Sequence, residues 1–161
     1  MSSPPVQIRH ATRADLPALG RLGAMLLRAH HAFDPQRFMA PRANSEDGYA
    51  WFLGTQLDEA EAVVLVAERD GAVVGYVYAG LEPLSWKELR DAAGFIHDVA
   101  VDDAVRRAGV ATALLDAAAQ WLRAHGAPRV VLWTAEQNGA AQRLFAKAGF
   151  RRTMIEMTKE L

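Results

Sequence analysis

The sequence contains no cysteine. Disulfide bonds, thiolate metal ligands and a cysteine nucleophile are therefore excluded, although this absence says little about the compartment. Continuous apolar runs are also short, because the longest one, residues 62–67, is far below the ~20 residues of a membrane-spanning helix. The first residues, MSSPPVQ, lack the apolar stretch of a signal peptide. We therefore expect a cytoplasmic protein.

The sequence also has little net charge. Its 18 lysines and arginines nearly balance 19 aspartates and glutamates, and 51% of the residues are hydrophobic. Nothing in this balance calls for a nucleic acid or a membrane surface as partner. A chain of 161 residues can bury roughly two thirds of its unfolded surface. We expect one domain over residues 1–161, with residues 1–5 disordered.

The hydrophobic periodicity alternates between that of strands and that of helices. Asp70 and Gly71 indicate a tight hairpin turn. Asn138 can cap the last helix, and Gly149 with Phe150 fits a left-handed helix end. The order β-α-α-β-β-β-α-β-α-β predicts an α/β domain with a mixed sheet. We expect strands at 6–9, on both sides of 70–71, at 94–101, 129–134 and 151–157, and helices at 15–31, 45–57, 109–125 and after 138.

The segment RRAGVA, residues 106–111, joins the fourth predicted strand to a helix with a wide apolar stripe. Unpaired N–H groups and a partial positive charge make a helix start a natural phosphate site. A dinucleotide-binding fold would need Gly-x-Gly-x-x-Gly directly after its first strand, and a nucleotide triphosphate loop would need Gly-Lys-Ser/Thr. Neither pattern is present here, so the phosphate belongs to another cofactor, unless the loop is simply solvated.

Three motifs together resemble the GNAT superfamily of acyl-CoA-dependent N-acetyltransferases. IHDVAVDDAVRRAGVATALL, residues 96–115, is similar to that family's strand 4, pyrophosphate loop and helix 3. Asn138, Ala141 and Leu144, followed by Gly149 and Phe150, resemble its next helix, and IRHATRADLPAL, residues 8–19, resembles its usual beginning. The resemblance covers nearly the whole chain. It implies a mixed, mostly antiparallel sheet in which strands 4 and 5 splay apart.

The resemblance also implies acetyl-CoA as the acyl donor, without a metal. The strand-4 backbone would pair with the pantetheine arm, the RRAGVA loop would bind the pyrophosphate through backbone N–H groups, and Asn138 would bind the arm. Lys147 or Arg143 could reach the adenosine phosphates, or lie on a solvated helix face. The implied coenzyme residues are Val99, Ala100, Val101, Arg106, Arg107, Ala108, Gly109, Val110, Ala111, Thr112, Asn138, Phe145 and Lys147.

The implied reaction is direct attack of an amine on the thioester in a ternary complex. Deprotonating an alkyl amine with a pKa of ~10.4 costs roughly 4–5 kcal/mol at neutral pH, whereas a thiol near 8.5 leaves as thiolate for about 2 kcal/mol. The base therefore matters more than the acid. Its candidates are His97, with a core histidine as the alternative, and Glu136, with a loop carboxylate as the alternative. The backbone amide of Val99 would donate to the oxyanion.

Two details of strand 4 and the last helix qualify this mechanism. We expect Phe95, His97, Val99 and Val101 on one strand face, and Asp98 on the opposite face with a structural or water-orienting role. Phe145 stands where the family has a tyrosine, and it cannot donate a proton to the leaving thiolate. A catalytically silent acyl-CoA-binding or interaction module of the same fold is therefore the alternative to an enzyme.

The resemblance places the acceptor pocket between the first two helices and the loop before strand 4. Aromatic side chains with scattered carboxylates suit a cationic amine with an apolar body, although Trp51 could instead fill the core. We expect Trp121 and Trp133 to pack inside, and no metal at the adjacent His30 and His31. Family members are frequently dimers, so a homodimer is compatible with the resemblance. The implied acceptor residues are His31, Phe33, Phe38, Tyr49, Trp51, Glu82 and Trp86.

Overall fold

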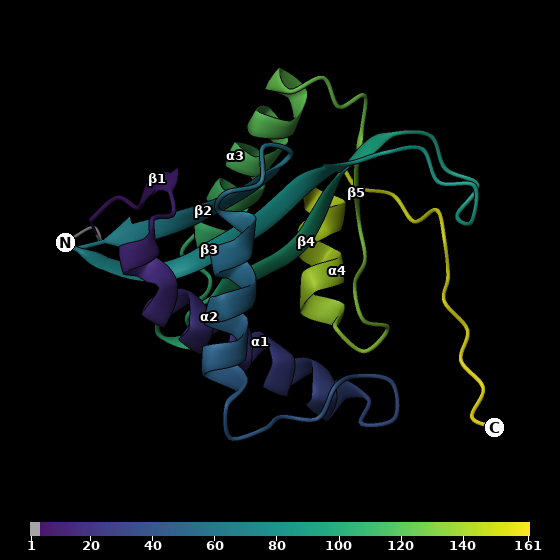
Figure 1. The fold of residues 1–161 in the computed structure, drawn as a ribbon, viewed down its shortest axis with the longest axis horizontal. Coiled ribbons are helices and arrows are strands. Elements are labelled where there is room, and N and C mark those ends of the chain that lie inside the picture. The colour runs from purple at the N-terminus through teal and green to yellow at the C-terminus, as the bar shows by residue number, and fades with distance from the viewer. Residues whose placement is uncertain (1–3) are drawn as a thin grey trace.

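The computed structural model describes residues 4–161, and its sheet has the strand order β1-β2-β3-β4-β5 (Figure 1). Short 3₁₀ turns at Arg13–Asp15 and Asp103–Val105 precede α1 and α3. The element order confirms the predicted one up to the last helix. The elements are β1 Gln7–His10, α1 Leu16–Phe33, α2 Ser45–Gln56, β2 Ala62–Arg69, β3 Ala72–Glu82, β4 Ala93–Val101, α3 Val110–Ala124, β5 Val130–Leu132 and α4 Gly139–Lys147.

Local sequence signals explain several of these boundaries. Asp70 and Gly71 both have positive φ angles, 52° and 78°, as the tight turn between β2 and β3 requires. The Asn138 side chain accepts a hydrogen bond from the Ala141 N–H at 3.1 Å and so caps α4. Gly149, with φ 94°, ends that helix, and the Phe150 N–H donates to the Phe145 carbonyl.

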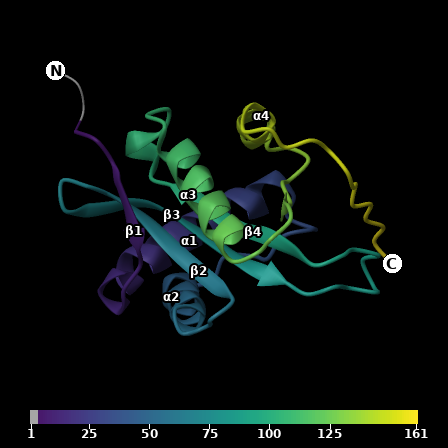
Figure 2. The ribbon, with the colours of Figure 1, turned by 90° about the horizontal axis from the view of Figure 1, so that it is seen from above.

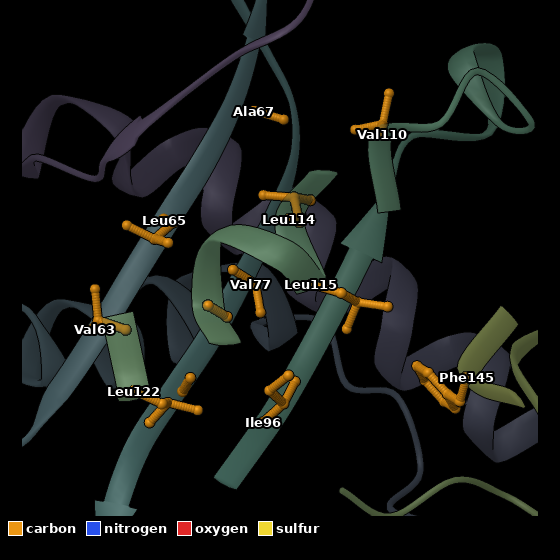
Figure 3. Close-up of a cluster of buried hydrophobic side chains, with 12 residues drawn as sticks. Val63, Leu65, Ala67, Val77, Ile96, Val110, Leu114, Leu115, Leu122 and Phe145 are labelled. Carbon is orange, nitrogen blue, oxygen red and sulfur yellow. The ribbon is translucent and has the colours of Figure 1, made fainter. Parts of the chain in front are cut away.

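Two hydrophobic cores lie on opposite faces of the sheet (Figure 2). Figure 3 shows the larger one, in which Leu114, Leu115 and Leu122 of α3 pack on β2, β3 and β4. The smaller core joins α1 and α2 to the other face. In it Tyr49 of α2 packs so tightly on α1 that a Cβ added at Gly23 would lie 2.1 Å from its ring. The strands β2, β3 and β4 therefore contribute residues to both cores.

All neighbouring strands are antiparallel except β4 and β5, which are parallel. The β4–β5 pairing covers only Gly94 to Ile96 against Val130 to Leu132. Beyond Ile96, β4 continues to Val101 with β3 on one edge and no strand on the other. The predicted splay of the two strands is thus confirmed.

A β-bulge interrupts β4 at His97. Tyr78 faces Asp98 across the sheet, but Ala79 faces Ile96, so His97 is the extra residue. The bulge overturns the prediction of one shared face, because Val99 pairs beyond it and packs with the α3 core, whereas the His97 ring lies against Tyr78 on the other face. Asp98 also lies on that face and contacts Tyr76, so it is not opposite His97 as predicted.

Residues 151–157 form no strand, which contradicts the prediction. Polar contacts hold this segment elsewhere: Arg152 donates to the Gln142 side chain on α4 at 2.6 Å, and Arg37, after α1, pairs with Glu156. The segment therefore never reaches a sheet edge in its own chain. In Figure 1 it runs from α4 away from the sheet.

The first residues of the chain were predicted to be disordered. Residues 1–3, part of the predicted disordered start, lie outside the described residues, and Pro4 and Pro5 are exposed and outside any helix or strand. Within residues 4–161, no helix combines the length and apolar character needed to cross a membrane.

Candidate active site

The candidate site lies where β4 and β5 separate. His97 Nε2 approaches Glu82 Oε1, at the end of β3, to 3.1 Å. The imidazole ring is stacked on Phe95 and tilted against Tyr78, with ring centroids 5.7 Å and 4.8 Å apart. The imidazole side chain is 30% exposed and the glutamate 38%. The bulge thus presents a histidine that is oriented by a carboxylate and open to solvent.

The Glu82 contact assigns roles to the two ring nitrogens. The contact places Nε2 beside the carboxylate at 3.1 Å, so the tautomer with its hydrogen on Nε2 is the one that the carboxylate favours, and in that tautomer Nδ1 carries the lone pair. Among residues 4–161, Nδ1 of His97 has no hydrogen-bond partner. The pair can therefore accept a proton at Nδ1, and the carboxylate would stabilise the imidazolium that forms.

An open cleft of about 270 Å³ adjoins this pair. Arg90 connects the β3–β4 loop to β4. The Arg90 Nε is 2.7 Å from Glu88 Oε2, and the Arg90 guanidinium lies 4.8 Å from the centre of the Phe95 ring. Trp133, directly after β5, meets Phe95 edge to face. The lining residues are Glu82, Glu88, Arg90, Phe95, Ile96, His97 and Trp133.

A buried polar cluster lies beside the pair. The hydroxyls of Tyr76 and Tyr49 donate to Asp98 Oδ2 at 3.0 Å and 3.2 Å. Burial raises the pKa of Asp98 above its ordinary value, an effect that the two hydroxyl donors partly oppose. Burial and the nearby carboxylate raise the pKa of both tyrosines. The Tyr49–Asp98 hydrogen bond joins α2 to β4, and the Tyr76–Asp98 hydrogen bond joins β3 to β4. Both bonds fix β4 at the residue next to His97.

The loop from β4 to α3 has the backbone features that the predicted anion cradle requires. Arg107 and Gly109 both have left-handed backbone, with φ 65° and 76°. Gly109 occupies the N-cap position of α3, where no side chain caps the helix, and within residues 4–161 the N–H groups of Val110, Ala111 and Thr112 lack an acceptor. A Cβ added at Gly109 would meet nothing within 4 Å. Uncapped donors around open space fit a phosphate group.

The charged side chains of this loop are arranged around its backbone. Arg106 pairs with Asp103 at 2.7 Å, and Asp102 accepts from the Ala104 N–H and from Arg21. The hydrogen bond from the Ala104 N–H, followed by the hydrogen bond and charge of Arg21, lowers the pKa of Asp102. Arg106 therefore shapes the loop through Asp103, while the exposed Arg107 and Ala108 stand beside the donors.

The predicted residues around α4 have mixed placements. The Asn138 side-chain oxygen caps the helix, so it is already engaged. Phe145 is 8% exposed and packs in the α3 core, 6.0 Å from the Phe150 ring. Lys147 lies exposed in the last turn of α4. Glu136 is exposed in the loop before α4 and does not line the cleft, so the structure does not bring it to His97.

Of the seven predicted acceptor residues, only Glu82 lines the cleft. Tyr49 points to Asp98, while Trp51 on α2 and Trp86 in the β3–β4 loop are 71% and 84% exposed and line no part of it. His31 contacts the Phe38 carbonyl at 3.2 Å, where the chain leaves α1.

Phe33 and Phe38 both pack on the ring of His30, whose Nδ1 lies 2.8 Å from the Leu26 carbonyl. The predicted aromatic set therefore divides into separate surfaces.

Trp133, Arg90, Glu88 and Phe95 line the cleft but were missed as site residues. The prediction that Trp133 packs inside is wrong, because its side chain is 73% exposed where β5 ends and the strands diverge. Trp121 does pack against the core. A signal existed for Phe95, which lies in β4 two residues before His97, and for Trp133, which directly follows β5. No sequence pattern brings Glu88 and Arg90 back to the cleft.

The chain was compared with known proteins. Residues 26–150 match the model of the acetyltransferase (GNAT) family. A mycothiol acetyltransferase of Cellulomonas flavigena is 31% identical over 134 residues, which are 80% of this chain and 36% of the relative. An N-alpha-acetyltransferase of Sulfurisphaera tokodaii is 34% identical over 113 residues, 65% of this chain and 66% of the relative. The chain thus spans less than two thirds of the length of each of these relatives.

Solved structures show the same fold. A protein of Bacillus halodurans superposes with a TM-score of 0.80 at 22% identity, covering 96% of this chain and 99% of the other. An aminoglycoside N-acetyltransferase solved with coenzyme A gives 0.76 at 17% identity, covering 99% and 97%. Together with the splayed strands and the cradle at α3, the family match means that this chain belongs to the GNAT acetyltransferase family.

Proposed function

We propose that the chain is an N-acetyltransferase that moves the acetyl group of acetyl-CoA to a primary amine of a small molecule or peptide by direct attack in a ternary complex. The observation that carries the proposal is the His97–Glu82 pair in a bulge of β4, at the open end of the strand splay. The uncapped start of α3 follows on the same strand and loop. Family membership supports acetyl transfer as the reaction.

Acetyl-CoA supplies the thioester carbonyl. The N–H groups from Arg107 to Thr112 would hold its pyrophosphate, because they surround open space at Gly109. The free edge of β4 from Val99 to Val101, opened by the end of β5, would pair with the extended arm. Val99 would donate its backbone N–H to the carbonyl oxygen as negative charge develops there.

His97 performs the step with the larger cost, removal of a proton from the amine. At neutral pH this costs roughly 4–5 kcal/mol for an ordinary alkyl ammonium. Nδ1 accepts the proton through a bridging water, and Glu82 offsets the positive charge that arrives on the ring. Glu82 therefore acts as the positioning residue for His97.

The leaving thiolate receives its proton from water. Phe145 offers no donor, since its ring is buried against Phe150. Thiolate release costs only about 2 kcal/mol at neutral pH, so an enzyme can function without an acid at this position.

The cleft favours an amine that carries an apolar or aromatic body. Phe95 and Trp133 offer ring faces and edges, and the carboxylates Glu82 and Glu88 outnumber the one permanent cation, Arg90. Such a site attracts an ammonium group and packs its apolar portion. The names of two relatives, a mycothiol acetyltransferase and an N-alpha-acetyltransferase, support acetyl transfer without selecting one acceptor.

Release of free thiol from acetyl-CoA tests this proposal. Polyamines, aminoglycosides, amino acids and peptide N-termini are each added to the intact protein, and at least one amine is expected to accelerate release above the amine-free rate. Coenzyme A binding is measured in parallel by calorimetry. Binding without amine-dependent release from any member of the panel would contradict the enzyme and identify the silent acyl-CoA-binding module of the same fold.

A further inference from the structure

Arg90 is a cation of the cleft whose side chain is already fixed by the protein. Its Nε donates to Glu88 Oε2 at 2.7 Å, and its Nη1 donates to the carbonyls of Asp91 at 2.8 Å and Pro83 at 3.3 Å. The guanidinium lies 4.8 Å from the centre of the Phe95 ring, and the side chain is 17% exposed. Contacts on several sides therefore hold the guanidinium in one orientation.

The backbone of Arg90 is fixed as well. The Ser85 N–H donates to the Arg90 carbonyl at 2.9 Å, and the Arg90 N–H donates to the Ser85 carbonyl at 3.1 Å, which closes the β3–β4 loop on itself. Ordering a free arginine side chain costs up to about 2 kcal/mol of rotamer entropy. Here folding has already met this cost, so a ligand that binds Arg90 does not have to meet it again.

One nitrogen of this fixed guanidinium is unused. Among residues 4–161, Nη2 of Arg90 has no acceptor. Within the same residues, the buried side-chain nitrogen that lacks a partner is Arg69 Nε, so Nη2 of Arg90 is open to solvent. Because Arg90 lines the cleft, two N–H donors of a permanent cation are available to a ligand there. A carboxylate is the acceptor that such donors bind most strongly.

Glu88 weakens this receptor without blocking it. Glu88 contacts Arg90 through one oxygen on Nε and leaves Nη2 open. The Glu88 side chain is 43% exposed, so water screens much of its charge. Arg90 can thus accept a second carboxylate, and removal of the Glu88 charge should strengthen that contact.

The proposed base lies beside the same aromatic ring. The His97 ring is stacked on Phe95 with a centroid distance of 5.7 Å, and Glu82 contacts His97. A molecule with both an ammonium and a carboxylate could place the first near Glu82 and the second at Arg90. Its apolar portion would then lie against Phe95 and Trp133, which also line the cleft.

We propose that the acceptor is an amino acid with an apolar or aromatic side chain, whose carboxylate binds Nη2 of Arg90 while its amine faces His97. The inference rests on the proposed function and narrows its acceptor from any primary amine to one that carries a carboxylate. In the transfer, the amine nitrogen forms a bond to the acetyl carbon and the C–S bond breaks. The amine proton passes to His97 Nδ1, and coenzyme A leaves as thiolate and takes a proton from water.

Matched acceptors that differ only in the carboxylate test this inference. Formation of the N-acetyl product is measured with L-phenylalanine and L-phenylalaninamide, and with 6-aminohexanoate and its amide for a longer spacing. In at least one pair, kcat/KM for the acid is expected to exceed that for the amide by at least about 10-fold, the contribution of a charged hydrogen bond. Phenylalaninamide loses its ammonium proton more readily than phenylalanine, so easier deprotonation cannot explain a preference for that acid.

Two variants with opposite expected effects separate recognition from structure. Arg90→Gln should bring the ratio of acid to amide close to one, mainly through KM, whereas lost stability would affect both acceptors equally. Glu88→Gln should raise the affinity for the acid. Arg123→Gln removes the same charge from the exposed end of α3 and should retain the ratio. Circular dichroism verifies that each variant is folded.

Calorimetry of L-phenylalanine and its amide with the protein loaded with coenzyme A keeps the two proposals apart, because it needs no turnover. Tighter binding of the acid, lost in Arg90→Gln, would support this inference even if no amine were acetylated and the proposed function failed. Acetylation of the amides as fast as the acids, or a preference for the acid that survives in Arg90→Gln, would overturn this inference and leave the proposed function standing.

Discussion

At the scale of single residues, His97 owes its position to one extra residue in β4. A regular strand would place Phe95, His97 and Val99 on one face. Because of the bulge, His97 lies against Glu82 and Tyr78, whereas Val99 packs in the α3 core on the other face. The residue type was predictable through the resemblance. The bulge was not, because the residues 95–101 read as an ordinary strand and the register is set by pairing with β3.

Replacing His97 with alanine should lower kcat/KM by about 10²- to 10³-fold, the usual contribution of a general base. The pH–rate profile should also lose the rise on its acidic side, since no imidazole remains to be deprotonated. Glu82→Gln should give a smaller loss and retain that rise, as expected of a positioning residue. His10→Ala, an exposed histidine at the end of β1, is the matched control. An unchanged profile in the His97 variant would remove it as the base.

Asp15 has a structural role at the same scale. The residue is 7% exposed. Its carboxylate accepts hydrogen bonds from Arg9 Nη1 at 2.8 Å, from Arg9 Nη2 at 3.0 Å and from the Thr12 N–H at 2.8 Å. The Arg9 hydrogen bonds lower its pKa below the ordinary 3.8. The ionised carboxylate therefore stabilises the fold above about pH 4 and loses this contribution as the pH falls through the lowered pKa.

Asp15→Asn should reduce the free energy of unfolding by about 1–3 kcal/mol at neutral pH, because the charged hydrogen bonds are lost. The loss should shrink below pH ~4, where the wild-type carboxylate becomes protonated as well. Urea denaturation at several pH values measures both effects. Asp116→Asn, an exposed site on α3, serves as control and should change little. A deficit that stays constant into acid would contradict the ion-pair explanation.

At the scale of elements, the start of α3 is the feature best predicted from sequence. A glycine after two arginines, placed between a strand and an apolar-striped helix, indicated a helix start with unpaired N–H donors, and the structure has such a start at Gly109. The left-handed backbone of Arg107 and Gly109 was not predicted. The last strand failed at this scale. Residues 151–157 have strand composition, but a strand needs a neighbour, and sequence does not show which edge is within reach.

Gly109→Glu should weaken coenzyme A binding at least about 10²-fold, close to 3 kcal/mol. The new side chain enters the open space with a charge that repels phosphate, on backbone that disfavours any side chain. Calorimetry measures the affinity, and thermal melting verifies that the variant folds. Gly48→Glu is the matched control, since Gly48 is exposed on α2 with no atom within 4 Å of an added Cβ. Equal affinities in the two variants would refute the cradle.

At the scale of the whole molecule, one sheet lies between two helical layers (Figure 2). The cleft is lined by residues of the sheet, of the β3–β4 loop and of the chain just after β5. The order of elements up to α4, the mixed sheet and the splay followed from periodicity and resemblance. The acceptor wall did not, because Glu88, Arg90 and Trp133 come together only through the path of the β3–β4 loop and the end of β5. Contacts between residues so far apart in the chain leave no local pattern in the sequence.

The central claim is acetyl transfer to nitrogen in this cleft, so the most direct measurement is the product itself. Isotopically labelled acetyl-CoA is incubated with the protein and the most active amine of the panel, and the product is analysed by mass spectrometry with fragmentation. We predict a labelled acetyl group on the amine nitrogen with wild type, strongly reduced with His97→Ala and absent with Gly109→Glu. Labelled product formed equally by all three proteins, or no labelled amide from any amine, would contradict the account.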